Sequence, residues 1–64
     1  MKYYQVTING VLTTQLRTLL DVAVRTGDII EGYTIGYNTI YFAAHDNNQI
    51  EGKLIRNGYE VSIG

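Results

Sequence analysis

Tyrosine is the side chain with the most evident binding chemistry in this sequence. The chain has six tyrosines, one phenylalanine and no tryptophan, so tyrosine supplies nearly all of its aromatic surface. A tyrosine ring buries a large area at a low entropic cost and adds a polar hydroxyl, which suits protein interfaces. The same rings also serve as ordinary strand residues, and they stack on nucleic-acid bases where cations lie nearby. We predict a partner-binding surface formed by Tyr3, Tyr33, Tyr37, Tyr41 and Glu31.

The cationic side chains define an alternative site. Arg17 and Arg25 flank Asp21 at intervals of four residues, so on a helix the carboxylate can pair with either guanidinium. This spacing is typical of a solvated, salt-linked helix face. The alternative function is a small nucleic-acid-binding regulator whose phosphate contacts come from this helix and a hairpin, through Arg17, Arg25, Lys53 and Arg56. A net charge of −1 and the absence of Lys and Arg from residues 27–52 count against nucleic-acid binding.

Residues suited to catalysis or metal binding are few. His45 is the only histidine, and its sequence neighbour Asp46 does not orient the ring as a spatially separate carboxylate would. Asp46, Asn48 and Glu51 carry oxygen donors, but their order does not match a calcium-binding loop. The glycine-rich motifs that bind nucleotide phosphates are missing from the sequence. We therefore expect no enzyme activity, no cofactor and no metal site.

The elements that must position these residues begin with a strand. Residues 3–8 alternate between two faces, with Tyr4, Val6 and Ile8 on one of them, and consist of strong strand formers. Asn9-Gly10 follows and is suited to a tight turn. This segment therefore predicts a strand that buries one face and exposes Tyr3 on the other.

An amphipathic helix is the clearest element in the sequence. Apolar side chains recur at helical spacing from Leu12 to Val24 and form a single stripe. Thr13 or Thr14 is a suitable N-cap, and Gly27 lies where a helix favours a residue that adopts the left-handed conformation. The spacing predicts a helix that ends just before Gly27.

The remainder of the chain has the pattern of extended structure. Apolar and aromatic residues follow in two runs between residues 29 and 43, with a turn predicted at residues 36–38 and a polar surface loop at residues 45–49. Asn57-Gly58 lies between two further apolar stretches, a pattern typical of a type I′ hairpin. We expect a hairpin over residues 53–63 that packs Leu54, Val61 and Ile63 against the helix.

The order of these elements predicts an α+β fold. We expect one compact domain over residues 1–64 with the order β-α-β-β-β, and a further strand in one variant. One amphipathic helix would pack on one face of a mainly antiparallel sheet. The second face or an edge of the sheet would then remain for a partner.

The size and composition of the chain limit the range of functions that we expect for it. At 64 residues the core is small, and the chain has no cysteine to staple it, so self-association as a homodimer is the expected source of extra stability. The lack of cysteine, of an apolar N-terminal run and of a long apolar stretch favours a cytoplasmic protein without membrane contact. We predict a small protein-binding module of bacterial or phage type that inhibits or regulates a larger protein by occupying its surface.

Overall fold

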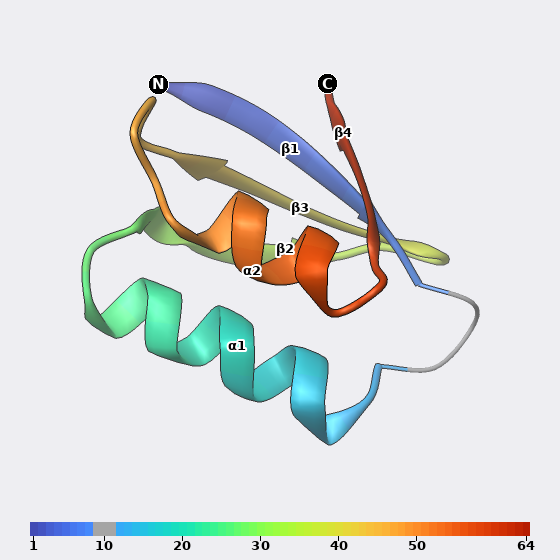
Figure 1. Ribbon diagram of the computed structural model, residues 1–64. Helices are drawn as coiled ribbons and strands as arrows, with labels where there is room; N and C mark the ends of the chain where they lie inside the picture. The colour runs from blue at the N-terminus through green and yellow to red at the C-terminus, as the bar shows by residue number, and fades with distance from the viewer. Residues whose placement is uncertain (9–11) are drawn as a thin grey trace.

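The computed structural model describes residues 1–8 and 12–64 and forms one antiparallel sheet with helices on one side (Figure 1). Its strands lie in the order β2-β3-β1-β4, and each neighbouring pair is antiparallel. The predicted α+β class and antiparallel sheet are confirmed, whereas the predicted Asn9-Gly10 turn lies outside the described residues. The elements are β1 (Lys2–Thr7), α1 (Thr14–Arg25), β2 (Ile29–Ile35), β3 (Thr39–Ala44), α2 (Ile50–Arg56) and β4 (Glu60–Ile63).

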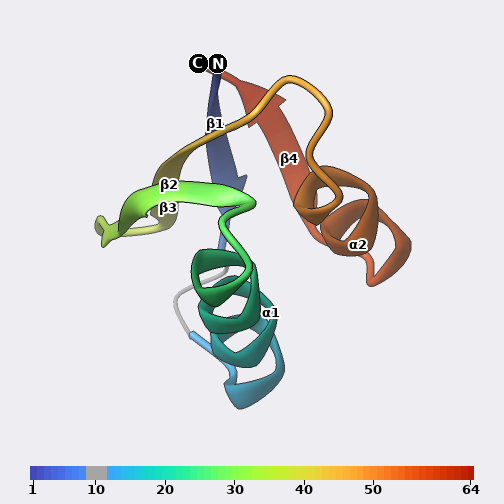
Figure 2. The same ribbon diagram turned by 90° about the vertical axis from the view of Figure 1, so that its left-hand side faces the viewer.

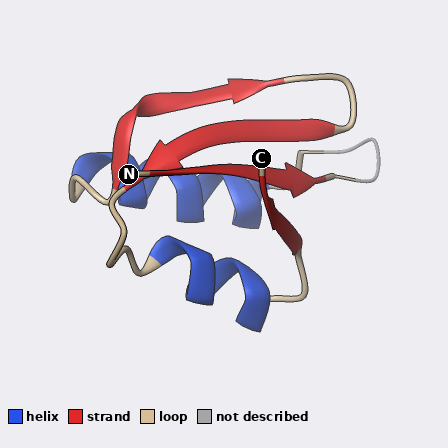
Figure 3. Ribbon diagram, turned by 90° about the horizontal axis from the view of Figure 1, so that it is seen from above, coloured by secondary structure: helices blue, strands red, loops and turns tan. Residues whose placement is uncertain are grey.

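Both helices cover the same face of the sheet. They run side by side in opposite directions (Figure 1), and the view from above shows them below the strands, with β1 between β3 and β4 (Figure 3). The core between helices and sheet is formed entirely by apolar side chains and one tyrosine. Its buried members are Tyr4, Val6, Ile8, Leu16, Leu20, Ala23, Ile29, Ile40, Phe42, Ala44, Ile50 and Leu54.

The alternation of β1 is confirmed. Tyr4 and Val6 are buried while Tyr3 and Gln5 are exposed, and the ring of Tyr4 stacks on Phe42 with centroids 5.3 Å apart. The predicted turn at residues 36–38 also connects β2 to β3 as expected.

Helix α1 is confirmed at both ends. The Thr13 hydroxyl accepts a hydrogen bond from the Leu16 amide at 3.2 Å, so Thr13 is the N-cap. Gly27 has a φ of 83°, and the Asp28 amide donates to the Ala23 carbonyl at 2.9 Å. This six-residue closure is the Schellman motif, which explains why a glycine follows the last helical turn.

The predicted hairpin over residues 53–63 is wrong, because its first half belongs to α2. Gly58 has a φ of 87°, and its amide donates to the Ile55 carbonyl at 3.0 Å while the Tyr59 amide donates to the Leu54 carbonyl at 3.1 Å. These bonds form a second Schellman motif. Asn57-Gly58 supplies the positive φ that both a type I′ turn and a helix C-cap require, and here it ends a helix. Only the second half of the hairpin is a strand, and β4 pairs with β1.

The start of α2 is fixed by residues from elsewhere in the fold. One carboxylate oxygen of Asp28 accepts hydrogen bonds from the amides of Gln49 and Ile50, both at 2.8 Å. The Asn48 side chain accepts a third bond, from the Glu51 amide at 3.0 Å. Side chains therefore satisfy the amides of Gln49, Ile50 and Glu51 at the start of α2, which have no helical partners.

Candidate protein-binding face

One face of the sheet is left uncovered by either helix (Figure 2). Residues that are paired across antiparallel strands direct their side chains to the same face. Tyr3 pairs with Ala43, Gln5 pairs with Tyr41 and with Ser62, and none of them belongs to the buried core. We call this surface the open face, and its members are Tyr3, Gln5, Thr7, Ile30, Thr34, Thr39, Tyr41, Ala43, Glu60 and Ser62.

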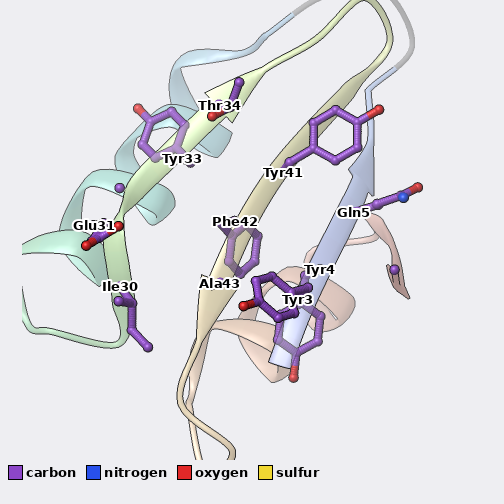
Figure 4. Close-up of a pocket in the computed structure, with 12 residues that line it drawn as sticks. Tyr3, Tyr4, Gln5, Ile30, Glu31, Tyr33, Thr34, Tyr41, Phe42 and Ala43 are labelled. Atoms are coloured by element: carbon purple, nitrogen blue, oxygen red, sulfur yellow. The ribbon is translucent and has the colours of Figure 1, made fainter. Parts of the chain in front are cut away.

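The open face contains a depression of about 510 Å³ formed by residues of β1, β2 and β3 (Figure 4). Tyr3 and Tyr41 are 58% and 45% exposed, so much of each ring is available to a ligand. Glu31 is the only charged residue that lines the depression. The surface is thus aromatic and nearly uncharged, with one acidic group.

The ring of Tyr41 lies directly against the backbone at Gly36. A Cβ atom placed on Gly36 would come within 3.0 Å of the Tyr41 ring and 3.2 Å of the Thr39 carbonyl oxygen. Close approach therefore favours glycine at this position, because a larger residue would force the Tyr41 ring or the Thr39 carbonyl to shift. The β2–β3 turn consequently sets how Tyr41 is presented on the open face.

Glu31 lies at an irregularity in β2. Its φ is 65° and that of Gly32 is 99°, and the register with β3 shifts between Ile30 and Tyr33. A glutamate in the left-handed region is unusual, because only glycine, asparagine and aspartate enter it readily. This bulge places the exposed Glu31 carboxylate beside the depression.

Tyr33 and Tyr37, the other two predicted interface tyrosines, differ in position, because Tyr33 also lines the depression and Tyr37 does not. Tyr33 pairs with Phe42 on the helix side of the sheet, and its hydroxyl donates to Asp21 of α1 at 2.6 Å. That hydrogen bond to the carboxylate is the main reason why the pKa of Tyr33 is raised above 10.0. Tyr37 is 92% exposed in the β2–β3 turn and does not line the depression. Of the predicted set, the depression thus brings together Tyr3, Glu31, Tyr33 and Tyr41, and Tyr37 lies outside it.

The predicted salt-linked face of α1 is not formed. Asp21 is bonded to Tyr33, and the only salt bridge among the described residues joins the Met1 amino group to Asp46 at 2.8 Å. The Met1 amino group is also the main reason why the pKa of Asp46 is lowered, first through their hydrogen bond and then through its charge.

The cations proposed for phosphate contacts lie on both helices and do not line the depression. Arg17 lies near Tyr33. Its positive charge offsets part of the rise in the pKa of the Tyr33 hydroxyl. Gln15 donates to Asn57 at 2.8 Å and so marks where the start of α1 meets the end of α2. Arg25, ten residues further along α1, is about 15 Å from that junction along the helix axis. Arg56 and Arg25 are therefore at opposite ends of the helical layer.

Several members of the open face were not predicted from the sequence, although strand alternation could have identified some of them. Ala43 follows Tyr41 by two residues in β3, so strand alternation places both on one face. Likewise Thr34 separates Tyr33 from Ile35 in β2, which indicates that those two share the opposite, apolar side. Ile30 precedes the bulge and could not be placed by alternation.

No cluster of three or more histidine, aspartate or glutamate residues suited to a metal ion occurs in the described part of the chain. Within residues 1–8 and 12–64, no helix has the length and apolar character required to cross a bilayer. Comparisons with protein-family models, curated proteins and solved structures found no match to this chain.

Proposed function

We propose that this chain is a small protein-binding module that inhibits or regulates a larger protein by occupying its surface. The observation that carries the proposal is the uncovered aromatic depression of the open face, with Tyr3 and Tyr41 half exposed at its centre. Exposed aromatic side chains in a concave setting are typical anchors of protein interfaces. We place its action in the cytoplasm of a bacterial or phage-infected cell, in keeping with a chain that has no cysteine.

The charge of the depression defines the chemistry of the partner. Its lining carries Glu31 and no Lys or Arg, so the complementary surface should present apolar groups at the centre and a basic group at the edge. The alternative of nucleic-acid binding has less support. Base stacking requires cations close to the aromatic rings, and the arginines proposed for phosphate contacts lie on the helices.

A matched pair of tyrosine variants tests the proposed binding face. Tyr41→Ala removes a ring from the depression, whereas Tyr37→Ala removes an exposed ring of the same chemistry outside it. The immobilised wild type and both variants would be exposed to nuclease-treated bacterial lysate, and retained proteins would be identified by mass spectrometry. We expect one protein to be retained by the wild type and Tyr37→Ala and lost with Tyr41→Ala.

The readout must separate loss of binding from loss of fold. Circular dichroism of Tyr41→Ala should match the wild type, because this side chain is outside the core. Equal retention by all three proteins, or retention that nuclease abolishes, would contradict the proposal. Charge reversal at Glu31 provides a second test: Glu31→Lys should slow association with a basic partner, and should do so most at low salt.

A further inference from the structure

The free edge of β4 carries hydrogen-bonding groups that no described residue satisfies. The amide of Gly64 donates to the Tyr3 carbonyl at 3.0 Å, and in an antiparallel ladder such bonded positions recur at every second residue. Ser62 and Glu60 therefore direct their backbone groups toward β1. The amides and carbonyls of Val61 and Ile63 point away from the sheet.

The opposite edge of the sheet, β2, is protected in two ways. The bulge at Glu31 and Gly32 interrupts its register with β3, and such irregularities deter pairing with a further strand. Tyr33 also fastens this strand to α1 through its bond to Asp21. Strand β4 has no bulge, no proline and no lysine.

Apolar side chains accompany the free groups of β4. Ile63 is 65% exposed, although it pairs with the buried Tyr4 and shares the helix-facing side of the sheet. The hydroxyl of Tyr4 donates to Glu51 at 3.2 Å, and Ile55, 56% exposed, lies one turn further along the same side of α2. Uncovered isoleucines on the strand and on the adjacent helix thus flank the same edge.

We propose that two copies of this chain associate by antiparallel pairing of their β4 edges. The register that uses every free group is centred on Ser62, with Val61 of each copy opposite Ile63 of the other. Each such pair exchanges two backbone hydrogen bonds. In this register no Glu60 faces another carboxylate side chain, and the four apolar side chains of these pairs gather on the helix-facing side.

The occupant is a second copy because the edge is complementary to itself. A two-fold axis through Ser62 brings identical donors and acceptors into register, as a closed dimer requires. The two sheets become one continuous sheet, and the unsatisfied edge disappears. The open faces of both copies then lie on the same side, so the dimer presents the aromatic depression twice.

Paired substitutions at the two edges test this dimer. Ile63 is the last residue of β4 and Ile35 is the last residue of β2, and both side chains are exposed. Ile35, like Ile63, directs its backbone groups away from the sheet, because the bonded position in β2 is the next residue, Gly36, whose amide donates to the Thr39 carbonyl. We would measure mass by analytical ultracentrifugation over a wide concentration range for the wild type, Ile63→Lys and Ile35→Lys. We expect a reversible dimer of twice 7.2 kDa for the wild type and for Ile35→Lys. Ile63→Lys should raise the dissociation constant about tenfold or more, because each of the two apolar pairs would then place a lysine opposite Val61.

A backbone modification makes the test specific for the strand edge. Chemical synthesis of a chain of this length permits N-methylation of Ile63, which removes one outward donor and keeps the side chain, with N-methylation of Ile35 as the control. We expect the first to weaken the dimer and the second to leave it unchanged. A wild type that stays monomeric at about 1 mM, near −4 kcal/mol of association free energy, would overturn the proposal. So would a dimer that Ile35→Lys or Tyr41→Ala dissociates while Ile63→Lys does not.

Discussion

The two helices end in the same way but begin in different ways. Gly27 and Gly58 both have positive φ and close Schellman motifs with equivalent hydrogen bonds. At its N-terminus α1 is capped by Thr13, the residue immediately before it, whereas α2 has one local capping bond, to Asn48, and two to Asp28, more than 20 residues earlier in the chain. Helix α1 thus carries its own stop and start signals, and α2 is formed by the tertiary structure.

The two helices also differ in length, which makes α2 more dependent on the tertiary structure than α1. Helix α1 has twelve residues and an apolar stripe, whereas α2 has seven residues and contains Gly52, which disfavours helix formation. Isolated helices this short are not stable in water. The contacts of Ile50 and Leu54 with the core must therefore supply most of the stability of α2.

The largest effect is expected from Leu54→Ala. Leu54 is fully buried, and its truncation should lower the free energy of unfolding by about 2–5 kcal/mol. A core of this size rarely supplies more than about 3–5 kcal/mol in total, so the variant should be largely unfolded. Urea denaturation followed by circular dichroism measures this loss. Ile55→Ala removes the exposed neighbouring side chain and should change stability by less than about 0.5 kcal/mol.

Removal of the two N-caps sharpens the comparison of the helices. Asp28→Ala and Thr13→Ala should each cost about 0.5–2 kcal/mol, because each leaves amides at a helix start without an acceptor. The two substitutions should destabilise different helices. Hydrogen exchange measured by NMR should show loss of protection in α2 alone for Asp28→Ala and around α1 for Thr13→Ala. Fraying of α2 in both variants would show that the helices do not differ as proposed.

The two C-cap glycines should respond equally. No atom lies within 4 Å of a Cβ placed on Gly27 or on Gly58, so the cost of alanine is backbone strain alone. We expect each substitution to lower the free energy of unfolding by about 1 kcal/mol. Matched thermal melts of the two variants provide the measurement. A much larger loss for Gly58→Ala would indicate that the turn into β4 has a further role.

The smallest effect concerns the bond that joins α1 to β2. The pKa of Tyr33 is raised in the folded protein, mainly by its hydrogen bond to Asp21, so folding favours the protonated phenol. Its contribution to stability is complete below the unfolded pKa of about 10 and is lost as the pH rises through the folded value. Tyr33→Phe should therefore lower the free energy of unfolding slightly at pH 7, and its difference from the wild type should disappear as the pH rises through the folded pKa of Tyr33. Urea titrations at pH 7 and at pH 11 would detect it, with Tyr37→Phe as the control.

The elements that depend on neighbouring residues could be predicted from the sequence. The alternation of Tyr4 and Val6 identified the buried side of β1, and Thr13 and Gly27 bounded α1 correctly. The exposure of Tyr3 and Tyr41 followed from the same alternation. In each case the determining residues lie within one turn or one strand.

The remainder depends on contacts between distant residues. Asn57-Gly58 is equally compatible with a hairpin and with a helix end, and the choice depends on distant contacts, which are the burial of Ile50 and Leu54 in the core and the bonds that Asp28 accepts. Tyr33 was predicted to bind a partner because of its residue type, and its hydrogen bond to Asp21, twelve residues away on α1, could not be predicted from local pattern. The position of Glu31 depends on a β-bulge that the residue pattern of β2 does not predict.

The central position of β1 has a consequence for synthesis on the ribosome. One neighbour of β1 is β3, and the other, β4, is made more than 50 residues after Thr7. At rates of about 5–20 residues per second, one side of β1 stays without its strand for about 3–10 s during translation. Nascent chains that emerge close together on one messenger can exchange their final strands in that interval. Less frequent initiation, which spaces the nascent chains further apart on the messenger, should therefore reduce misassembled protein and increase the yield of correctly closed sheets.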